Sequence, residues 1–197
     1  SNYKFVTPVK TAFPQKMTAI IYNAETLDVI DSGNKSFSNA LNFKSRRIVW
    51  AVFKTKSTNK IFIVLNTHLS FLNKNGNDEN YTTQACQVNE LYTTIQTLYS
   101  QYSYPILIIG DFNTKRRVNY QNHVIASGSY GILNSFLTDA EKDAKNKYSG
   151  ENFSFKNTLN DHIFIYGDIR VRNLALLSQD YFSKISDHYP LLADFSL

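Results

Sequence analysis

The chain has 197 residues, of which 43% are hydrophobic and 14% aromatic, so its length and composition suit one globular domain with a sizeable core. No apolar run reaches the roughly 20 residues that a membrane span needs, and no signal peptide stands at the start. The formal net charge of +5 slightly favours an anionic partner but does not identify nucleic acid. The single cysteine, Cys86, excludes an intramolecular disulfide and a cysteine-rich zinc site, and leaves the compartment open between cytoplasm and secretion. Nothing in the sequence sets the oligomeric state.

Seven short runs rich in Ile, Val, Phe and Tyr predict β-strands. Two of them, 61–65 and 105–109, are apolar at consecutive positions, which indicates burial on both faces of a sheet. The predicted strands are Tyr3–Val6, Met17–Asn23, Ile48–Lys54, Ile61–Asn66, Ile106–Gly110, His162–Tyr166 and Leu191–Phe195.

One long helix is predicted from Thr82 to about Tyr102, between two of these strands, where a crossover would pack on a sheet. Its apolar stripe consists of Ala85, Val88, Leu91, Tyr92, Ile95, Leu98 and Tyr99. Shorter helices are predicted at Tyr120–Ala126 and Tyr130–Leu137, and the polar segment Glu141–Glu151 predicts a solvated surface loop. With no repeat and no linker, the pattern predicts a single α/β (α+β) domain over residues 1–197, with helices covering sheets.

Polar residues stand directly after two of the buried strands. In an extended chain Asp111 and Asn113 point the same way, while Phe112 between them points to the core. The carboxylate can orient and deprotonate a water, and the amide can donate to a phosphoryl oxygen. A simple turn explains Gly-Asp-x-Asn equally well. His68 can donate to a phosphate oxygen or protonate a leaving group, and a strand-end histidine with a structural role is the alternative.

Two further polar motifs precede strands near the end of the chain. Asp161 can accept a hydrogen bond from an imidazole and fix its tautomer, whereas the adjacent His162 faces the other way and suits a structural role. Asp187 and His188 can both line one site only on a loop, which Pro190 favours by restricting the residue before it. The carboxylate suits Mg²⁺ and the imidazole suits acid–base chemistry. The structural alternatives are a residue that only starts a strand, for Asp161, and a polar turn before a strand, for Asp187 and His188.

Two basic clusters flank these motifs, and the second would place positive charge close to a bound phosphate. Solvated loops are the alternative explanation for both. The clusters are Lys44, Arg46 and Arg47, and Lys115, Arg116 and Arg117. Together, the repeated Asp, Asn and His residues at strand ends indicate metal-assisted attack on a phosphate ester.

In this order the motifs resemble those of the endonuclease/exonuclease/phosphatase family, over essentially the whole chain. The residues that carry the resemblance are Asn66-Thr67-His68-Leu69, Gly110-Asp111-Phe112-Asn113, Asp161-His162-Ile163-Phe164 and Ser186-Asp187-His188-Tyr189-Pro190. The resemblance implies a DNase I-like four-layer sandwich, in which two packed β-sheets are flanked by helices. It also implies hydrolysis of a phosphodiester or a phosphomonoester with Mg²⁺ or Mn²⁺.

The resemblance further implies a role for each matching residue. Asp111 would activate or orient the attacking water, Asn113 would position the phosphate, and Asp187 would help to bind the metal. His68, and His188 paired with Asp161, would hold the phosphate and stabilise the transition state. The expected phosphate- or substrate-binding residues are Asn66, Arg46, Arg47, Lys115 and Arg116. The basic loop slightly favours nucleic acid or a phospholipid headgroup as the substrate.

One departure from the family concerns the metal site. The family begins with a strand carrying a metal-linked Asn and a second strand ending in Gln-Glu, but this chain has no Gln-Glu pair, and Tyr3–Val6 matches the segment after those strands. We therefore expect an N-terminally incomplete fold that corresponds to the C-terminal three-quarters of the family domain. We favour a fragment or trimmed product; completion by a separate polypeptide and a non-catalytic binding module are the alternatives. A zinc hydrolase built from His68, Asp111, His162 and His188 is more distant, because it would need His162 to face inward.

Overall fold

The computed structural model describes residues 2–7, 18–38, 46–71, 78–115, 117–120, 123–126, 128–149 and 159–197. Its strands are β1 (Tyr3–Val6), β2 (Ile20–Asn23), β3 (Leu27–Ser36), β4 (Arg47–Thr55), β5 (Ile61–His68), β6 (Ile106–Asp111), β7 (Arg117–Tyr120), β8 (His123–Ala126), β9 (Thr138–Asp139), β10 (Asn146–Ser149), β11 (Asp161–Tyr166), β12 (Arg170–Leu176) and β13 (Leu191–Ser196). Its helices are α1 (Asp78–Tyr102), α2 (Gly128–Phe136), α3 (Ala140–Asp143) and α4 (Asp180–Ser183).

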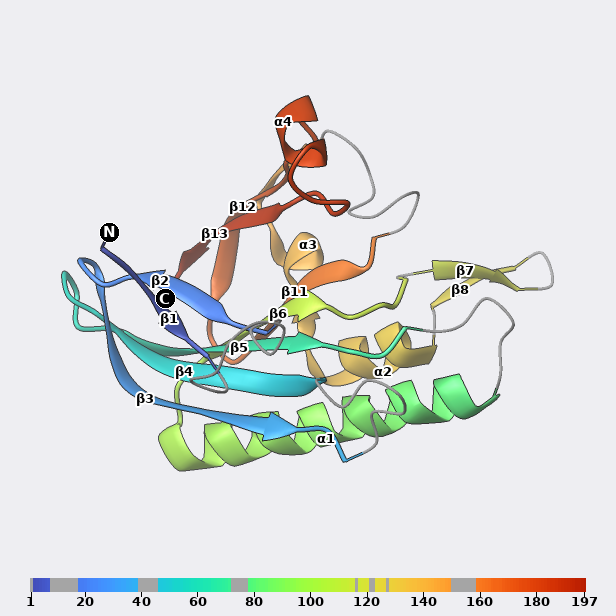
Figure 1. The fold of residues 1–197 in the computed structure, drawn as a ribbon, viewed down its shortest axis with the longest axis horizontal. Coiled ribbons are helices and arrows are strands. Elements are labelled where there is room, and N and C mark those ends of the chain that lie inside the picture. Colours follow the sequence, from blue (N-terminus) through green and yellow to red (C-terminus); the bar gives the residue numbers. More distant parts are fainter. Residues whose placement is uncertain are drawn as a thin grey trace.

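The largest sheet has six strands in the order β3-β4-β5-β6-β11-β9 (Figure 1). Its strands pair antiparallel except β5 and β6, which run parallel and are joined by α1 as the crossover. Ile63 and Leu65 of β5 belong to the core on one face of this sheet, and Val64 between them belongs to the core on the other. The consecutive apolar run therefore has the two-sided burial that was predicted from it.

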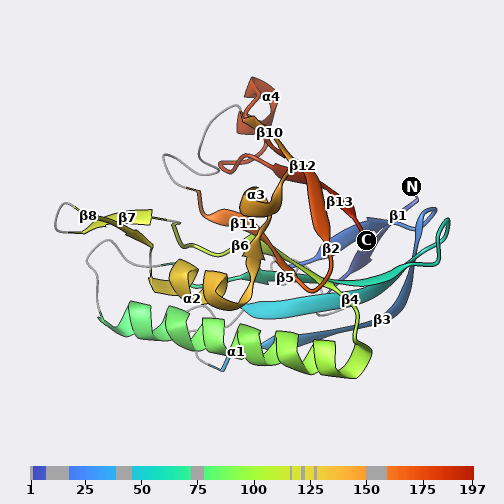
Figure 2. The same cartoon turned by 180° about the vertical axis from the view of Figure 1, so that it is seen from behind.

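Helices α1 and α2 cover one face of this sheet (Figures 1 and 2). The fully buried stripe of α1 consists of Val88, Leu91, Ile95 and Leu98. The long helix is thus confirmed, and α2 confirms the shorter helix expected near Tyr130. Tyr92 and Tyr99, also placed on the stripe, lie at its edge, where their rings contact Phe136 and Tyr166. Among the described residues no helix is both long and apolar enough to cross a membrane.

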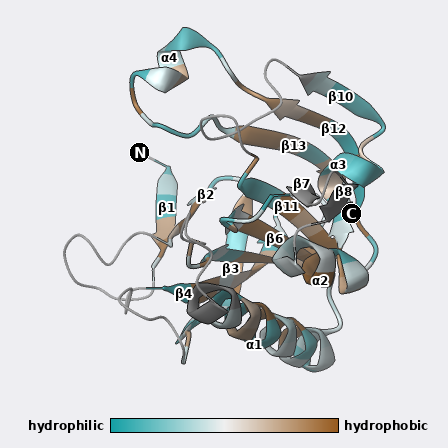
Figure 3. Cartoon of the chain, turned by 90° about the vertical axis from the view of Figure 1, so that its right-hand side faces the viewer, coloured by the Kyte–Doolittle hydropathy of each residue, from teal (hydrophilic) through white to brown (hydrophobic). Residues whose placement is uncertain are grey.

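The other face of the six-stranded sheet packs against the β1-β2 hairpin and a three-stranded sheet in the order β10-β12-β13 (Figure 3). The core between them combines Val49, Ala51 and Phe53 of β4 with apolar residues of β2, β12 and β13. The predicted α/β fold, with two packed sheets and flanking helices, is therefore confirmed.

Two local predictions are wrong. The segment expected as a helix near 120–126 forms part of a hairpin, in which β7 pairs antiparallel with β8 and Tyr120 is opposite His123. The preference of its β-branched residues Val118, Val124 and Ile125 for extended backbone outweighs the helix-like spacing of its apolar residues. The segment expected as a loop from Glu141 contains α3, with Asp139 as its N-cap, and β10, an exposed edge strand.

Strands β3 and β12 and helix α4 were also not predicted, because their sequences are polar or short. Strand β3 has ten residues but lies at a sheet edge, so most of its side chains are exposed and no apolar run marks it. Strand β12 alternates exposed residues such as Arg170 and Arg172 with buried ones, and α4 has only four residues.

Candidate active site

His68, Asp111 and Asp161 lie side by side at the ends of three neighbouring strands. The register pairs His68 of β5 with Asp111 of β6, and Asp111 with Asp161 of β11. Residues in register on adjacent strands share a face, and these three lie on the face that packs against the second sheet. Sheet pairing therefore brings two carboxylates and an imidazole together from positions far apart in the sequence.

The next residues along the same strands, Thr67, Gly110 and His162, face the helices. A Cβ on Gly110 would lie 1.9 Å from the Thr67 carbonyl oxygen, and its φ of +142° disfavours other residues. His162 is buried, and its Nε2 lies 2.9 Å from the Thr114 carbonyl oxygen in hydrogen-bonding geometry. It has the structural position predicted for it, and its burial on this face argues against the zinc alternative.

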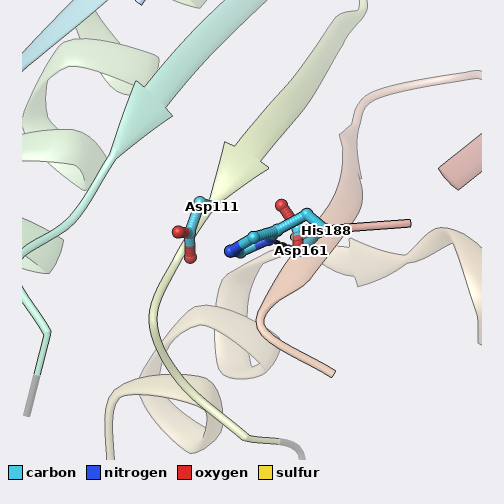
Figure 4. A group of neighbouring side chains, drawn as sticks. All are labelled: Asp111, Asp161 and His188. Atoms are coloured by element: carbon cyan, nitrogen blue, oxygen red, sulfur yellow. Dashed lines mark hydrogen bonds and ion pairs between the residues drawn. The ribbon is translucent and has the colours of Figure 1, made fainter. Parts of the chain in front are cut away.

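His188 contacts this row from the segment between α4 and β13. Its Nδ1 donates to Oδ2 of Asp161 at 2.7 Å, and both side chains are about a quarter exposed. Figure 4 shows the imidazole lying between the carboxylates of Asp161 and Asp111. Because a carboxylate only accepts, this bond places the proton on Nδ1 and leaves Nε2 directed toward the Asp111 side. The adjacent Asp187 is exposed, so only one residue of the pair enters the cluster.

The Asp111 carboxylate is held by several donors. Its Oδ2 lies 3.1 Å from His68 Nε2, and its Oδ1 accepts from the Asn113 backbone N–H at 2.8 Å. Burial acts to raise the pKa of Asp111, but the hydrogen bond and charge of His68, the Asn113 N–H and the charge of His188 outweigh it and lower the pKa below 3.8. Asp111 is therefore ionised at neutral pH.

The turn that was the alternative explanation occurs after β6, and Phe112 points into the core as predicted. Asn113 has φ +47°, so the chain turns there, and the bond from its N–H to Asp111 closes an Asx-type turn. Phe112 is fully buried, as expected. The Asn113 side chain donates from Nδ2 to the Leu69 carbonyl at 2.9 Å, which leaves one amide hydrogen for a ligand.

The residues expected to bind phosphate do not all reach the cluster. Arg46 is buried close enough to Asp111 for charge interaction, although burial lowers its pKa. Arg47 instead donates to the side chains of Asn34 and Ser36 on β3. 

The remaining substrate-binding predictions also differ in placement. Asn66 donates from Nδ2 to the Ala19 carbonyl at 2.9 Å, which ties β5 to the segment before β2. Lys115 is exposed beyond Thr114, and Arg116 lies outside the described residues.

The metal-capable group among the described residues is Asp111, Asp161 and His188, whose ligand atoms lie within 4.8 Å of one another. Asp161 and His188 of this group are already hydrogen-bonded to each other. Asp187, the predicted metal ligand, is outside this group, but its carboxylate has no hydrogen-bond or ion-pair partner among the described residues. An exposed carboxylate suits a hard divalent cation that takes oxygen ligands and retains water.

Comparison with solved structures identifies the architecture. An endonuclease/exonuclease/phosphatase from Bacteroides vulgatus superposes with a TM-score of 0.76 at 21% identity, covering 100% of this chain and 77% of that one. The chain has the endonuclease/exonuclease/phosphatase fold. The mannosyl-6-phosphatase of Bacteroides thetaiotaomicron shares this fold with a TM-score of 0.74 at 19% identity, over 100% of this chain and 78% of that one. D. rerio TDP2 complexed with a single-strand DNA product does so with a TM-score of 0.66 at 14% identity, over 100% and 78% of the two chains.

The sequence matches no protein-family model, and no curated protein matches it. The endonuclease/exonuclease/phosphatase fold is therefore recognised through its architecture and through the order of its polar motifs. The sequence alone did not indicate the contact between His68 and Asp111, because that contact depends on the parallel register of β5 and β6.

Proposed function

We propose that this protein is a metal-dependent phosphoesterase that hydrolyses a phosphate ester by attack of water on phosphorus. The observation that carries the proposal is the cluster of His68, Asp111 and Asp161 at the ends of β5, β6 and β11, which His188 joins from the segment between α4 and β13. Solved proteins of the same fold include one named a mannosyl-6-phosphatase and one complexed with a single-strand DNA product, which supports phosphate-ester chemistry.

Asp111 suits the role of orienting the attacking water. Its lowered pKa keeps it ionised, so it can always accept a hydrogen bond from water, although the same low pKa makes it a weak base. As the new oxygen–phosphorus bond forms, the water becomes more acidic and passes its proton to Asp111, while the bond from phosphorus to the ester oxygen breaks and that oxygen takes a proton from solvent.

The two histidines suit the stabilisation of negative charge on the phosphoryl oxygens. Asp161 fixes the tautomer of His188 and stabilises its protonated form, so that Nε2 can donate to an oxygen that gains charge. His68 lies on the other side of Asp111, and its Nε2 is bonded to Asp111 Oδ2, so the donor that it retains for a phosphoryl oxygen is Nδ1 in the protonated form. Arg46 adds a buried positive charge behind the carboxylate.

Asp187 is the residue we assign to a divalent metal ion such as Mg²⁺ or Mn²⁺. When bound, the ion would supply positive charge to a phosphate oxygen. The carboxylate is exposed, so it is accessible to a hydrated cation and to substrate together.

The proposal is tested by comparing Asp111→Asn with the wild type on a phosphomonoester, a nitrophenyl phosphodiester and single-stranded DNA, with Mg²⁺ and with chelator. We expect wild-type turnover of at least one substrate that requires the metal, and a loss of at least about 100-fold in the variant. Asp168→Asn is the matched control, because the Asp168 side chain is 94% exposed and has only a weak contact with Arg170. Substrate binding without turnover by the wild type would instead favour the non-catalytic binding module.

A further inference from the structure

Two glutamines near the start of α1 are fully buried next to the loops that follow β5 and β6. Gln84 and Gln87 are each 0% exposed. Because they are three residues apart, they share one face of the helix, on the same side as its apolar stripe. A buried amide is unfavourable unless it is hydrogen-bonded, so the contacts of these two side chains explain why they are there.

Gln84 donates to backbone carbonyls of both loops. Its Nε2 lies 2.7 Å from the Ser70 oxygen in the first loop, and 3.3 and 3.2 Å from the oxygens of Phe112 and Asn113 in the second. An amide group has two hydrogens, so one serves Ser70 and the other is shared by the two carbonyls of the second loop. The Gln84 Oε1 is buried with no partner among the described residues, so the side chain acts here as a donor only.

Gln87 holds the first loop through a single residue. Its Oε1 accepts from the Ser70 backbone N–H at 2.8 Å, and its Nε2 donates to the Ser70 Oγ at 3.0 Å. The N–H, the hydroxyl and the carbonyl of Ser70 are therefore all bonded to the two glutamines.

The residues held in this way stand two positions after His68 and Asp111. Asn113 adopts a left-handed backbone conformation, which is uncommon for residues other than glycine but is tolerated by asparagine. Its carbonyl is held by Gln84, and its N–H holds Oδ1 of Asp111. The glutamines thus connect, through short backbone links, to the two side chains that contact each other in the candidate active site.

We propose that Gln84 and Gln87 are positioning residues, which fix the loops after β5 and β6 so that His68 and Asp111 keep their contact. The kinetic part of this inference rests on the proposed phosphoesterase function. The structural part does not, because the bonds to the loops exist whatever the reaction is.

The test is Gln84→Met, which keeps the length of the side chain and removes the donor. Gln96→Met is the matched control, since Gln96 lies on the same helix and donates to the Tyr166 hydroxyl, away from the site. We expect Gln84→Met to lower kcat by about 10- to 100-fold with KM within about threefold, because misplaced groups retard the chemical step more than they weaken binding. Gln96→Met should change neither constant.

Amide hydrogen exchange gives a readout that does not depend on activity. Gln84→Met should speed exchange at the Leu69 and Asn113 amides by about tenfold or more, while exchange within β4 stays unchanged. Ser70→Ala, which removes only the hydroxyl bond to Gln87, is the milder second variant if Gln84→Met does not fold. The proposal would be overturned if a variant with faster amide exchange in the loops kept the kcat of the wild type. It would also be overturned if Gln84→Met and Gln96→Met lowered kcat equally. If the wild type hydrolyses no phosphate ester, the proposed function fails, and unchanged exchange at both amides would then refute the structural part separately.

Discussion

Replacing Gly110 by alanine should destabilise the protein far more than an ordinary glycine substitution. The new Cβ would lie 1.9 Å from the Thr67 carbonyl oxygen, whereas contacts below 3.0 Å essentially never occur, so β5 and β6 would have to separate by more than 1 Å. The carbonyl is backbone inside a paired sheet and cannot rotate away as a flexible side chain could. The φ of +142° adds strain that alanine cannot avoid.

These two terms set the expected size of the effect. Strained backbone costs about 1–3 kcal/mol and overpacking of a core costs about 1–3 kcal/mol, so the sum is about 2–6 kcal/mol. For a domain of this length, each kcal/mol lowers the melting temperature by about 2–4 °C, which predicts a fall of at least about 4 °C. The proposed phosphoesterase activity should fall as well, because the separation moves Asp111 away from His68.

The assay is thermal unfolding followed by circular dichroism, with Gly128→Ala as the control. Gly128 begins α2, and a Cβ there would meet nothing within 4 Å, so alanine should be neutral or stabilising by up to about 1 kcal/mol. If both variants unfold at the same temperature as the wild type, the close approach of β5 and β6 at Gly110 is not as the structure describes it.

Two further substitutions test the electrostatics of the site. Asp161→Asn replaces the charged acceptor of a hydrogen bond worth about 1.5–3 kcal/mol by a neutral amide that stabilises protonated His188 less, so kcat should fall by about 10- to 100-fold without loss of the fold; an unchanged kcat would contradict the role assigned to the pair. His68→Ala removes the main influence that lowers the pKa of Asp111, so that pKa should rise. An Asp with a lowered folded-state pKa stabilises the protein above its unfolded value of 3.8, and this stability is lost as the pH falls through the folded value; the variant should therefore begin to lose stability at a higher pH than the wild type, as measured by urea unfolding between pH 3 and 7. Identical pH dependence of the two proteins would show that His68 does not control Asp111.

The parts of the fold that could be predicted from the sequence are those buried on both faces or along one stripe. Runs such as Ile61–Leu65 have no stable alternative to burial, so the sequence predicted their strands nearly to the residue. Edge strands need only backbone hydrogen bonds, so β3 and β10 carry polar sequences that look like loops. The hairpin of β7 and β8 was mistaken for a helix because four-residue strands are too short to show a clear period.

The candidate site was predictable as a set of residues but not as a set of contacts. Position at the end of a buried strand is visible in the sequence, which is why His68 and Asp111, after their strands, and Asp161, before its strand, could be chosen. Their pairing depends on strand order and register, which local patterns do not contain. Local sequence patterns also do not show the direction of long side chains, so the roles of Arg46 and Arg47 could not be distinguished. Arg46 is buried near Asp111, whereas Arg47 donates to side chains of β3.

Register also explains why His162 is buried beside a catalytic candidate. Side chains alternate along β11, so Asp161 faces the active-site row only if His162 faces the helices, where it packs against Phe112 and Tyr130. A slip of one residue would replace Asp161 in the row by a neighbour and would move His162 out of its aromatic surroundings. The apolar contacts of His162 and the hydrogen bond of Asp161 to His188 therefore select the same register. The packing of His162 on one face of β11 therefore determines the position of Asp161 on the other face, although the two side chains need not contact each other.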